Sequence, residues 1–599
     1  MNFAPTRDLS IALIGSGGDG VIATGEMLVQ AAAREGIHAM LVKMFGPQIR
    51  GGESCARVRI CVDPVHSTGD EVDVLVVFSW SDYFRFTDEI ELKPGLIILH
   101  DETQIPKNTP TLPIHDKRLK PNVMHVPFAE LAVASAGNAI AKNMVTLGAL
   151  AQLVNIPFGG LLQSVEKKFH RKGEAVISSN QAALNKGREF IESLSPGFPV
   201  PQLEETHRPS RMVITGNDAL ACGAFSAGCR FYAGYPITPS SEVMEWLAKE
   251  LPRAEGVMIQ TEDEISAINM VIGASHAGKK AMTATSGPGL SLMQEAIGLA
   301  SISETPAVIM DVQRVGPSTG IPTKSEQSDL NAAIYGSHGD AAKVVLAPTD
   351  SHNAFFVARR AFEISERYQL PVIVLSDQYI GQRLETIEPI AGDLSPVEAR
   401  VNPELDPNGD YKRFANTQDG ISPVAPLGLM GGEYLASGIE HDEHGHPTSS
   451  YSLHQEMNEK RYKKFESIVQ EYGIVYRHGS QSATIGMLGW GSTQGVLIEA
   501  IELLAQEKLE VSALVPELIY PLPIEAIDQY LAHVDYALVF ELSYSAQFYH
   551  LLRSEVAEPD KLICCARSGA KLLSRHEIAD DVRKHQLALN QRKQEPVSA

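Results

Sequence analysis

Three stretches of this chain alternate short apolar runs with amphipathic segments, and this alternation limits the folds that the chain can adopt. Short apolar runs bounded by turn residues are typical of buried strands, and the amphipathic segments between them are typical of crossover helices. In the first stretch the apolar runs include 11–14, 72–78 and 96–100. The sequence therefore predicts a multi-domain α/β protein with parallel strands.

Composition separates three such blocks from two segments of different character. The expected α/β domains occupy residues 8–194, 211–383 and 482–590. A Pro-rich polar segment at 195–210 predicts a linker, whereas residues 384–481 are rich in Pro, Asn, Gly, Asp and His. Because that second segment is too long for an ordinary loop, we expect an extended arm that lies over a neighbour.

Individual elements can be placed within the second and third blocks. Each expected strand is a short apolar run, and the expected helix follows a Gly-rich turn. The expected elements are strands at 257–260, 307–312, 371–376 and 484–488, and a helix at 494–508.

Net charge and hydropathy exclude several classes of function. The formal net charge is -22, which disfavours nonspecific binding to nucleic acid or to an anionic membrane. No apolar run approaches the roughly 20 residues that span a bilayer, and the polar N-terminus has no signal-peptide pattern. The sequence therefore predicts a cytoplasmic protein with no nucleic-acid or membrane partner.

The cysteines and histidines predict no metal centre on this chain. The cysteines include no Cys-x-x-Cys pair, whereas an iron–sulfur cluster generally needs about four thiolates, several of them close in sequence. Residues 441–446 hold three histidines and two carboxylates too close together for all to reach one ion, and Gly445 predicts a turn. Cys564 and Cys565 are expected to be buried thiols at a strand end.

A Gly-rich turn at 15–20 has the Gly-x-Gly-x-x-Gly spacing of a dinucleotide-binding loop. Such a loop needs an acidic residue at the end of the second strand, but that strand, expected at 36–43, ends with Lys43. A tight turn is therefore favoured, although the helix N-terminus could still hold a phosphate-bearing ligand such as coenzyme A. Asp19 lies in a Gly-Asp-Gly sequence similar to a thiamine-diphosphate motif. The first Asn after it, Asn108, is too distant to complete the magnesium site of such a motif.

The second block contains Tyr235-Pro236-Ile237-Thr238-Pro239 before an amphipathic segment at 242–251. Thr238 is expected to be the N-cap of the following helix, with Pro239 at the first helical position. The backbone N–H groups and the hydroxyl at that helix end could bind a carboxylate, or Thr238 could only cap its own helix.

A second group of polar residues stands immediately before the next expected helix, at 265–277. Glu262, Asp263 and Glu264 precede this segment, whose small and apolar residues are typical of a helix buried in an interface. The helix dipole alone favours acidic residues there, but a desolvated carboxylate could share a proton with a ligand nitrogen. A Thr-Ser-Gly-Pro-Gly sequence follows at 285–289.

These segments resemble the α subunit of the 2-oxoacid:ferredoxin oxidoreductases, whose Tyr-Pro-Ile-Thr-Pro signature matches residues 235–239 without a change. The acidic helix and an Arg-Val-Gly-Pro-Ser-Thr-Gly segment at 314–320 follow in order. The resemblance covers nearly the whole chain. The first block is similar to the family's γ subunit, the second to its pyrimidine-binding domain for thiamine diphosphate, and the third to its transketolase-like C-terminal domain.

The resemblance implies a division of labour between two chains. Thiamine diphosphate would lie between them, with its aminopyrimidine on this chain and its diphosphate, Mg²⁺ and a [4Fe–4S] cluster on a β subunit. Ferredoxin would exchange electrons with the complex, coenzyme A would be the co-substrate, and a second αβ unit is expected. The missing magnesium motif and the unclustered cysteines agree with this division.

The resemblance also implies cofactor contacts for particular residues. A Glu must hydrogen-bond a ring nitrogen of the aminopyrimidine to activate the cofactor, and in related enzymes it stands nine residues before a Gly. Glu264 and Gly273 have that spacing, with Glu262 as the alternative. The further residues implied to contact the cofactor are Tyr235, Pro236, Ile237, Ser286 and Gly287.

The resemblance implies that Arg314, Thr323 and Thr238 recognise a substrate carboxylate. The chemistry of Arg314 suits this role, because a guanidinium can bind a carboxylate through two hydrogen bonds. Arg50 lies in a Gly-rich loop at 45–54. It is expected to meet the distal carboxylate of a dicarboxylic substrate or the anionic groups of coenzyme A. A mobile surface loop is the alternative interpretation.

The activity implied is oxidative decarboxylation of a 2-oxo acid, with electrons passed to ferredoxin and the acyl group to coenzyme A. The fused γ–α arrangement and the basic loop favour 2-oxoglutarate as substrate and succinyl-CoA as product, in either direction. Pyruvate or another 2-oxo acid would need only a different pocket. A non-oxidative, transketolase-like subunit would use the same pyrimidine site without a cluster.

Overall fold

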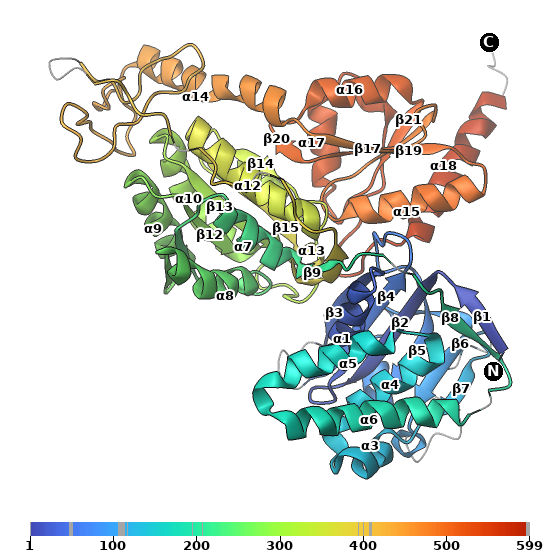
Figure 1. Ribbon diagram of the computed structural model, residues 1–599. Helices are drawn as coiled ribbons and strands as arrows, with labels where there is room; N and C mark the ends of the chain where they lie inside the picture. The colour runs from blue at the N-terminus through green and yellow to red at the C-terminus, as the bar shows by residue number, and fades with distance from the viewer. Residues whose placement is uncertain are drawn as a thin grey trace. The chain divides into compact units, whose positions relative to one another are not determined.

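The computed structural model describes residues 2–46, 52–105, 114, 116, 118–194, 196–206, 208–392, 394–398, 400–405 and 410–594. They form a multi-domain α/β structure (Figure 1), as the sequence predicts. The chain divides into two compact units, Met1–Thr215 with Gln382–Ile390 and Gly216–Gly381 with Ala391–Ala599. No helix within the described ranges is long and apolar enough to cross a bilayer.

The first unit is built around one mixed sheet. Across this sheet the strands are β7 (Asn122–His125), β6 (Glu91–His100), β5 (Glu71–Val77), β2 (Asp8–Ser16), β4 (Glu53–Cys61), β3 (His38–Phe45), β16 (Leu384–Ile387) and β9 (Met212–Thr215). The strands β2, β5, β6 and β7 are parallel, which confirms the three buried runs expected in this block. The strands β9 and β16 belong to the segments that lead into and out of the second unit.

Helices pack on this sheet, and two of them approach each other closely. The helices are α1 (Val21–Arg34), α2 (Trp80–Tyr83), α3 (Phe128–Ala136), α4 (Lys142–Val154), α5 (Phe158–Phe169) and α6 (Glu174–Glu192). A Cβ atom on Gly148 of α4 would lie 1.8 Å from the Leu184 carbonyl oxygen, and one on Gly187 of α6 would lie 1.9 Å from that of Val145. Only glycine at these two positions allows the helices to pack at this distance.

The Pro-rich segment predicted as a linker instead contains a strand. Strand β8 (Pro199–Leu203) pairs in parallel with β1 (Asn2–Thr6) in a two-stranded sheet. Val200 and Leu203 are buried in the core of the first unit. Proline is tolerated here because each strand of such a sheet has a free edge.

The second unit contains two sheets. The larger has the strand order β11 (Val257–Gln260), β10 (Phe231–Gly234), β12 (Ala281–Thr285), β13 (Ala307–Gln313), β15 (Pro371–Asp377), β14 (Val344–Leu346) and β20 (Leu518–Tyr520). The smaller has the order β17 (Val475–Gly479), β19 (Val511–Pro516), β18 (Ile485–Leu488), β21 (Tyr536–Val539) and β22 (Leu562–Cys564). The four strands expected in these blocks are confirmed to within one residue at each end.

One hydrophobic core joins the second and third blocks of the sequence. Strand β20, from the third block, pairs antiparallel with β14, and Trp490 packs in the same core as Ile334. The helices of this unit are α7 (Gly216–Ser226), α8 (Ser241–Glu250), α9 (Glu264–His276), α10 (Gly287–Ile302), α11 (Leu330–Tyr335), α12 (Ser351–Tyr368), α13 (Gln378–Gln382), α14 (Tyr451–Tyr472), α15 (Thr493–Gln506), α16 (Ile524–His533), α17 (Gln547–Glu555) and α18 (Arg575–Gln594).

The expectation of buried thiols at the end of β22 is wrong. Cys564 is exposed and Cys565 is only partly buried. The reason is topological, because β22 is an edge strand of the smaller sheet and the chain leaves the sheet at Cys564.

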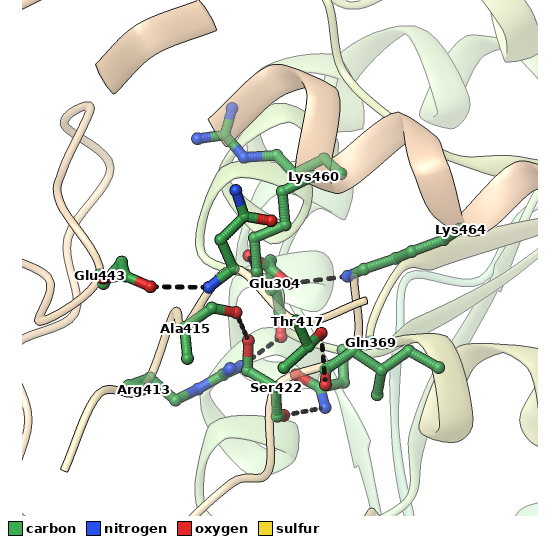
Figure 2. A network of polar contacts seen from close by, with 12 residues as sticks. Glu304, Gln369, Arg413, Ala415, Thr417, Ser422, Glu443, Lys460 and Lys464 are labelled. Atoms are coloured by element: carbon green, nitrogen blue, oxygen red, sulfur yellow. Dashed lines mark hydrogen bonds and ion pairs between the residues drawn. The ribbon is translucent and has the colours of Figure 1, made fainter. Parts of the chain in front are cut away.

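The described part of the arm packs on its own chain through a buried ionic cluster (Figure 2). The Glu304 carboxylate accepts hydrogen bonds from Lys460 Nζ at 2.5 Å and Lys464 Nζ at 2.7 Å, and Arg413 Nη2 donates to the Glu304 carbonyl at 2.8 Å. Glu304 and both lysines are fully buried. Burial opposes ionisation of Glu304, but the lysines outweigh it and hold the pKa of this carboxyl well below its usual range. The cluster therefore joins α14 and the arm to the end of α10.

Replacement of Glu304 by Gln should unfold the arm and α14 at a lower temperature. The variant leaves two buried ammonium groups without a counter-charge, which typically costs about 3–5 kcal/mol. The measurement is the thermal unfolding midpoint of the full chain. Glu295→Gln is the control, because Glu295 is an exposed residue of α10, the helix that ends just before Glu304. Equal midpoints for the two variants would contradict the structural role of the cluster.

Candidate active site

A cavity of about 680 Å³ lies in the second unit, at the carboxyl ends of strands β12 and β13. This edge of a parallel sheet is the usual ligand-binding position in α/β folds. The walls of the cavity come from the start of α10, the loop after β13, the loop before α11 and the third block of the sequence. The lining residues are Gly287, Pro288, Ser291, Arg314, Val315, Gly316, Pro317, Ser318, Glu326, Ser328, Asp329, Ser543, Tyr544, Ser545 and Ser568.

Glu264 is the first residue of α9 and is only 6% exposed. Helix α9 begins here because the side chain of the N-cap residue, Asp263, accepts a hydrogen bond from Ser266 N. The Glu264 carboxylate lies against the first turn of α10, where a Cβ on Gly289 would be 2.7 Å from its Oε1. No described residue donates a hydrogen bond to this carboxylate. A buried carboxylate with open acceptor positions fits a ligand that brings its own N–H donor.

The neighbouring acidic residues have different surroundings. Glu262 precedes the helix and is exposed, whereas Asp263 is occupied as the N-cap. Hydrogen bonding to the Ser266 amide, which favours the ionised form, lowers the pKa of Asp263. Of the three carboxylates, Glu264 alone is both buried and without a donor among the described residues.

Thr238 is not the N-cap that the sequence predicts. Helix α8 begins at Ser241 with Ser240 as its N-cap. The residues before it form a turn in which both the Ser240 amide and its hydroxyl donate to the Ile237 carbonyl, at 2.9 and 3.0 Å. This turn delays the helix and leaves the half-buried Thr238 hydroxyl without a described partner. In the same loop, Tyr235 and Pro236 are exposed.

Arg314 follows β13 and is 7% exposed. Its Nη1 donates to the Thr238 carbonyl at 2.7 Å, which brings two of the expected carboxylate-binding residues together. Its Nε is buried without a hydrogen-bond partner. Burial lowers the pKa of the Arg314 guanidinium, whereas the Asp329 and Asp311 carboxylates act in the opposite direction. The guanidinium at the cavity wall therefore retains donor capacity for an anionic ligand.

The loop after Arg314 closes on itself as a hairpin. The Val315 amide donates to the Lys324 carbonyl at 3.0 Å, and the Ile321 amide donates to the Val315 carbonyl at 3.0 Å. Thr323 is half-buried at the base of this hairpin, and no described residue contacts its hydroxyl by a hydrogen bond. Arg50 lies in the range 47–51, outside the described residues.

The first turn of α10 is the remaining part of the expected cofactor site. Ser286 is the N-cap of α10, is fully buried, and its Oγ has no hydrogen-bond partner. At Gly287 a Cβ would lie 2.7 Å from Asp329 Oδ2. A side chain at position 287 would therefore displace the Asp329 carboxylate.

Sequence reasoning missed Asp311, Glu326 and Asp329. The Glu326 carboxylate accepts hydrogen bonds from Gly316 N at 3.1 Å and Gly569 N at 2.9 Å and thereby fixes two walls of the cavity. One signal was available for Asp311, because an acidic residue inside the apolar run 307–312 is unusual for a buried strand. The contacts of Glu326 and Asp329 depend on residues distant in sequence and gave no local signal.

Comparisons with known proteins give the class. A family model described as the thiamine-diphosphate-binding domain of pyruvate flavodoxin/ferredoxin oxidoreductase matches residues 222–460. A second, described as pyruvate ferredoxin/flavodoxin oxidoreductase, matches residues 10–190. Together with the fold, these matches identify the chain as a subunit of a thiamine-diphosphate enzyme.

Individual relatives identify the family within this class. The α subunit of 2-oxoacid:ferredoxin oxidoreductase 2 of Aeropyrum pernix is 30% identical over 96% of this chain and 97% of its own length. The 2-oxoglutarate synthase subunit KorA of Methanocaldococcus jannaschii is 40% identical over 52% of this chain and 83% of its own. The chain belongs to the 2-oxoacid:ferredoxin oxidoreductase family, which confirms the resemblance.

A solved structure matches almost the entire chain. The 2-oxoglutarate:ferredoxin oxidoreductase of Magnetococcus marinus, with 2-oxoglutarate, coenzyme A and succinyl-CoA bound, is 36% identical with a TM-score of 0.90. The alignment covers 97% of this chain and 99% of that one.

Proposed function

We propose that this chain is the subunit of a 2-oxoglutarate:ferredoxin oxidoreductase that holds the aminopyrimidine of thiamine diphosphate. The complex would convert 2-oxoglutarate and coenzyme A to succinyl-CoA and CO₂, with electrons passed to ferredoxin. Substrate and co-substrate are proposed from the likeness to the Magnetococcus marinus enzyme, which spans both units of this chain.

The buried, open Glu264 carboxylate is the observation that carries the proposal. The aminopyrimidine of thiamine diphosphate presents a ring nitrogen that needs a carboxyl partner, and Glu264 has no described donor to compete for that role. Thiamine diphosphate, when bound, supplies the carbon nucleophile that attacks the 2-oxo group. Glu264 would hold a proton at the ring nitrogen, and Ser286 and Gly287 at the adjacent helix start would leave room for the ring.

Arg314 is proposed to bind the carboxylate that leaves as CO₂. Its Nη1 is held by the Thr238 carbonyl, so the guanidinium is oriented before a substrate arrives. A charge-assisted hydrogen bond from its remaining donors would orient the substrate carboxylate. Thr238 and Thr323 offer hydroxyl donors with no described partner, and Arg50 stays a prediction for the distal carboxylate or coenzyme A.

A β subunit is proposed to cover the exposed face of α9 and α10. Ile265, Met270 and Leu292 are 50%, 42% and 50% exposed, and a Cβ on Gly273 would meet nothing within 4 Å. Exposed apolar side chains on adjacent helices are typical of an interface. The diphosphate, Mg²⁺ and an iron–sulfur cluster are proposed to lie on that partner.

Met270→Glu should weaken association with the β subunit. A carboxylate in the centre of such an interface is expected to cost ~2 kcal/mol or more of binding free energy. Co-purification of a tagged β subunit measures the effect. Leu587→Glu is the control, because Leu587 is 62% exposed on α18. Retention of β by the Met270 variant at the level of the control would contradict the proposed interface.

The proposed activity is tested with the chain co-expressed with its β subunit and assayed without oxygen. The assay contains thiamine diphosphate, Mg²⁺, coenzyme A and a viologen dye. We expect dye reduction that requires coenzyme A, with kcat/KM at least about tenfold higher for 2-oxoglutarate than for pyruvate. A preference for pyruvate would contradict the proposed substrate but not the proposed reaction type. No reduction with either acid, in a complex that contains iron and thiamine, would contradict the function.

A further inference from the structure

Asp311 is an acidic residue in the middle of a buried strand. It is fully buried in β13, and both of its carboxylate oxygens lack a hydrogen-bond donor. Its neighbours across the sheet, Thr285 of β12 and Leu375 of β15, carry no charge. An ionised carboxylate in such a place is costly, so Asp311 is expected to hold a proton or to share one.

Asp329 lies beside this strand, because its amide donates to Gln313 Oε1 at 3.1 Å and Gln313 stands two residues from Asp311 on the same face of β13. Its Oδ2 is buried without a donor, its carboxylate lies against Gly287, and it lines the cavity that also contains Arg314. Two carboxylates cannot hydrogen-bond each other, whereas a carboxylic acid donates to a carboxylate. A single proton between Asp311 and Asp329 therefore gives both residues a partner that neither has when both are ionised.

The charges around the pair support one retained proton. Burial raises the pKa of Asp311 well above its usual range, and the Asp329 charge and a hydrogen bond to Asp329 raise it further. Burial and the Glu326 charge raise the pKa of Asp329 to about 7, against the opposing effects of Arg314 and of the bond to Asp311. Arg314 and Glu326 are the charged groups that act on the pair from the adjoining loops, and Gly287 of α10 adds none.

We propose that Asp311 and Asp329 share one proton and that this proton limits the negative charge beside Arg314, so that the guanidinium can bind an anionic substrate. The proposal rests on the proposed function, because it takes Arg314 as the carboxylate-binding residue. The protonated pair carries one negative charge, and the deprotonated pair carries two. Asp311 and Asp329 are positioning residues: they act on the substrate through Arg314.

The charge change sets the direction of a pH effect. The charge on Asp329 is one of the causes that raise the pKa of Asp311, so Asp329 ionises first, at its raised pKa of about 7, and Asp311 still holds its proton above that pH. The negative charge that appears on Asp329 then competes with the substrate carboxylate for Arg314, so KM rises, and the shared proton keeps a second charge from appearing. An additional charge a few ångströms from a bound carboxylate is expected to raise KM about tenfold or more between about pH 6 and about pH 8.5. The change in kcat is expected to be smaller, because the pair is not placed at the reacting atoms.

Infrared difference spectra of the full-length chain test the shared proton without any turnover. We expect the carbonyl band of one carboxylic acid to disappear between about pH 6 and about pH 8.5 as Asp329 ionises, and a second carboxylic-acid band, from the proton that Asp311 keeps, to remain above that range. Asp329→Asn should lack the band that disappears, and Asp311→Asn should lack the band that remains. Glu541→Gln is the control, because burial raises the pKa of Glu541 to about 7 in a side chain that caps α17 and does not line the cavity. Spectra of the two Asn variants identical to wild type would overturn the shared proton.

Kinetics of the αβ complex test the effect on Arg314. Asn at position 329 carries no charge and can donate its amide to Asp311, so KM for 2-oxoglutarate should lose its alkaline rise in Asp329→Asn. Glu541→Gln should keep the rise. A rise that persists unchanged in Asp329→Asn would overturn the proposal. If the wild-type complex reduces no dye with any 2-oxo acid, the proposed function fails, and the infrared bands still decide whether the pair shares a proton.

Discussion

Glu264→Gln should nearly abolish turnover. The glutamine keeps the shape of the side chain but cannot exchange a proton with the ring nitrogen of the cofactor. A positioned acid–base group typically contributes about 100- to 10,000-fold to the rate, so kcat should fall by a factor in that range. The measurement is dye reduction by the αβ complex with saturating 2-oxoglutarate and thiamine diphosphate.

The control for this prediction is a change at a neighbouring glutamate. Glu262→Gln changes an exposed residue two positions earlier and should leave kcat near the wild-type value. Exchange of the thiamine C2 proton with deuterium gives a second readout, and this exchange should slow in Glu264→Gln alone. A larger loss in Glu262→Gln than in Glu264→Gln would show that the wrong carboxylate has been assigned.

Arg314→Lys should lose substrate affinity while the complex stays assembled. Lysine keeps the positive charge but lacks the planar fork that can hold the Thr238 carbonyl and a substrate carboxylate together. Loss of a charge-assisted hydrogen bond at a buried site costs about 2–3 kcal/mol, so kcat/KM should fall roughly 30- to 150-fold. KM should account for most of the change.

Arg253→Lys is the matched control, since Arg253 is a surface residue that pairs with Glu250 through a side chain that is 66% exposed. It should leave KM unchanged, because surface pairs contribute little. A KM in Arg314→Lys equal to that of Arg253→Lys would remove Arg314 from substrate binding.

The sequence predicted the strands and helices of this chain better than it predicted how they meet. Apolar periodicity is a local property, so 257–260 was placed as a strand without error, and α9 differs from the expected helix by one residue at each end. The predicted start of α8 was wrong, because a hydrogen-bonded turn at Ile237–Ser240 stands where a capping threonine was expected. Local hydrogen bonds of this kind compete with the helix and leave no composition signal.

The polar interior could not be predicted from sequence. Glu304 and Lys460 are 156 positions apart, and only the packing of α14 on the end of α10 brings them together. Asp329 lies against Gly287 for a similar reason, since the loop before α11 folds over the start of α10. Glu264 could be singled out by its spacing to Gly273, but its lack of a described donor became visible only in three dimensions.

The most direct test of the central claim is to measure electrons and acyl product together in one anaerobic reaction of the αβ complex. With 2-oxoglutarate and coenzyme A, we expect succinyl-CoA to form in fixed proportion to dye reduced, with one electron pair for each molecule of CO₂ released. Omission of thiamine diphosphate should stop both. Release of CO₂ with succinic semialdehyde as product and no dye reduction would show a non-oxidative enzyme and would contradict the proposed oxidoreductase.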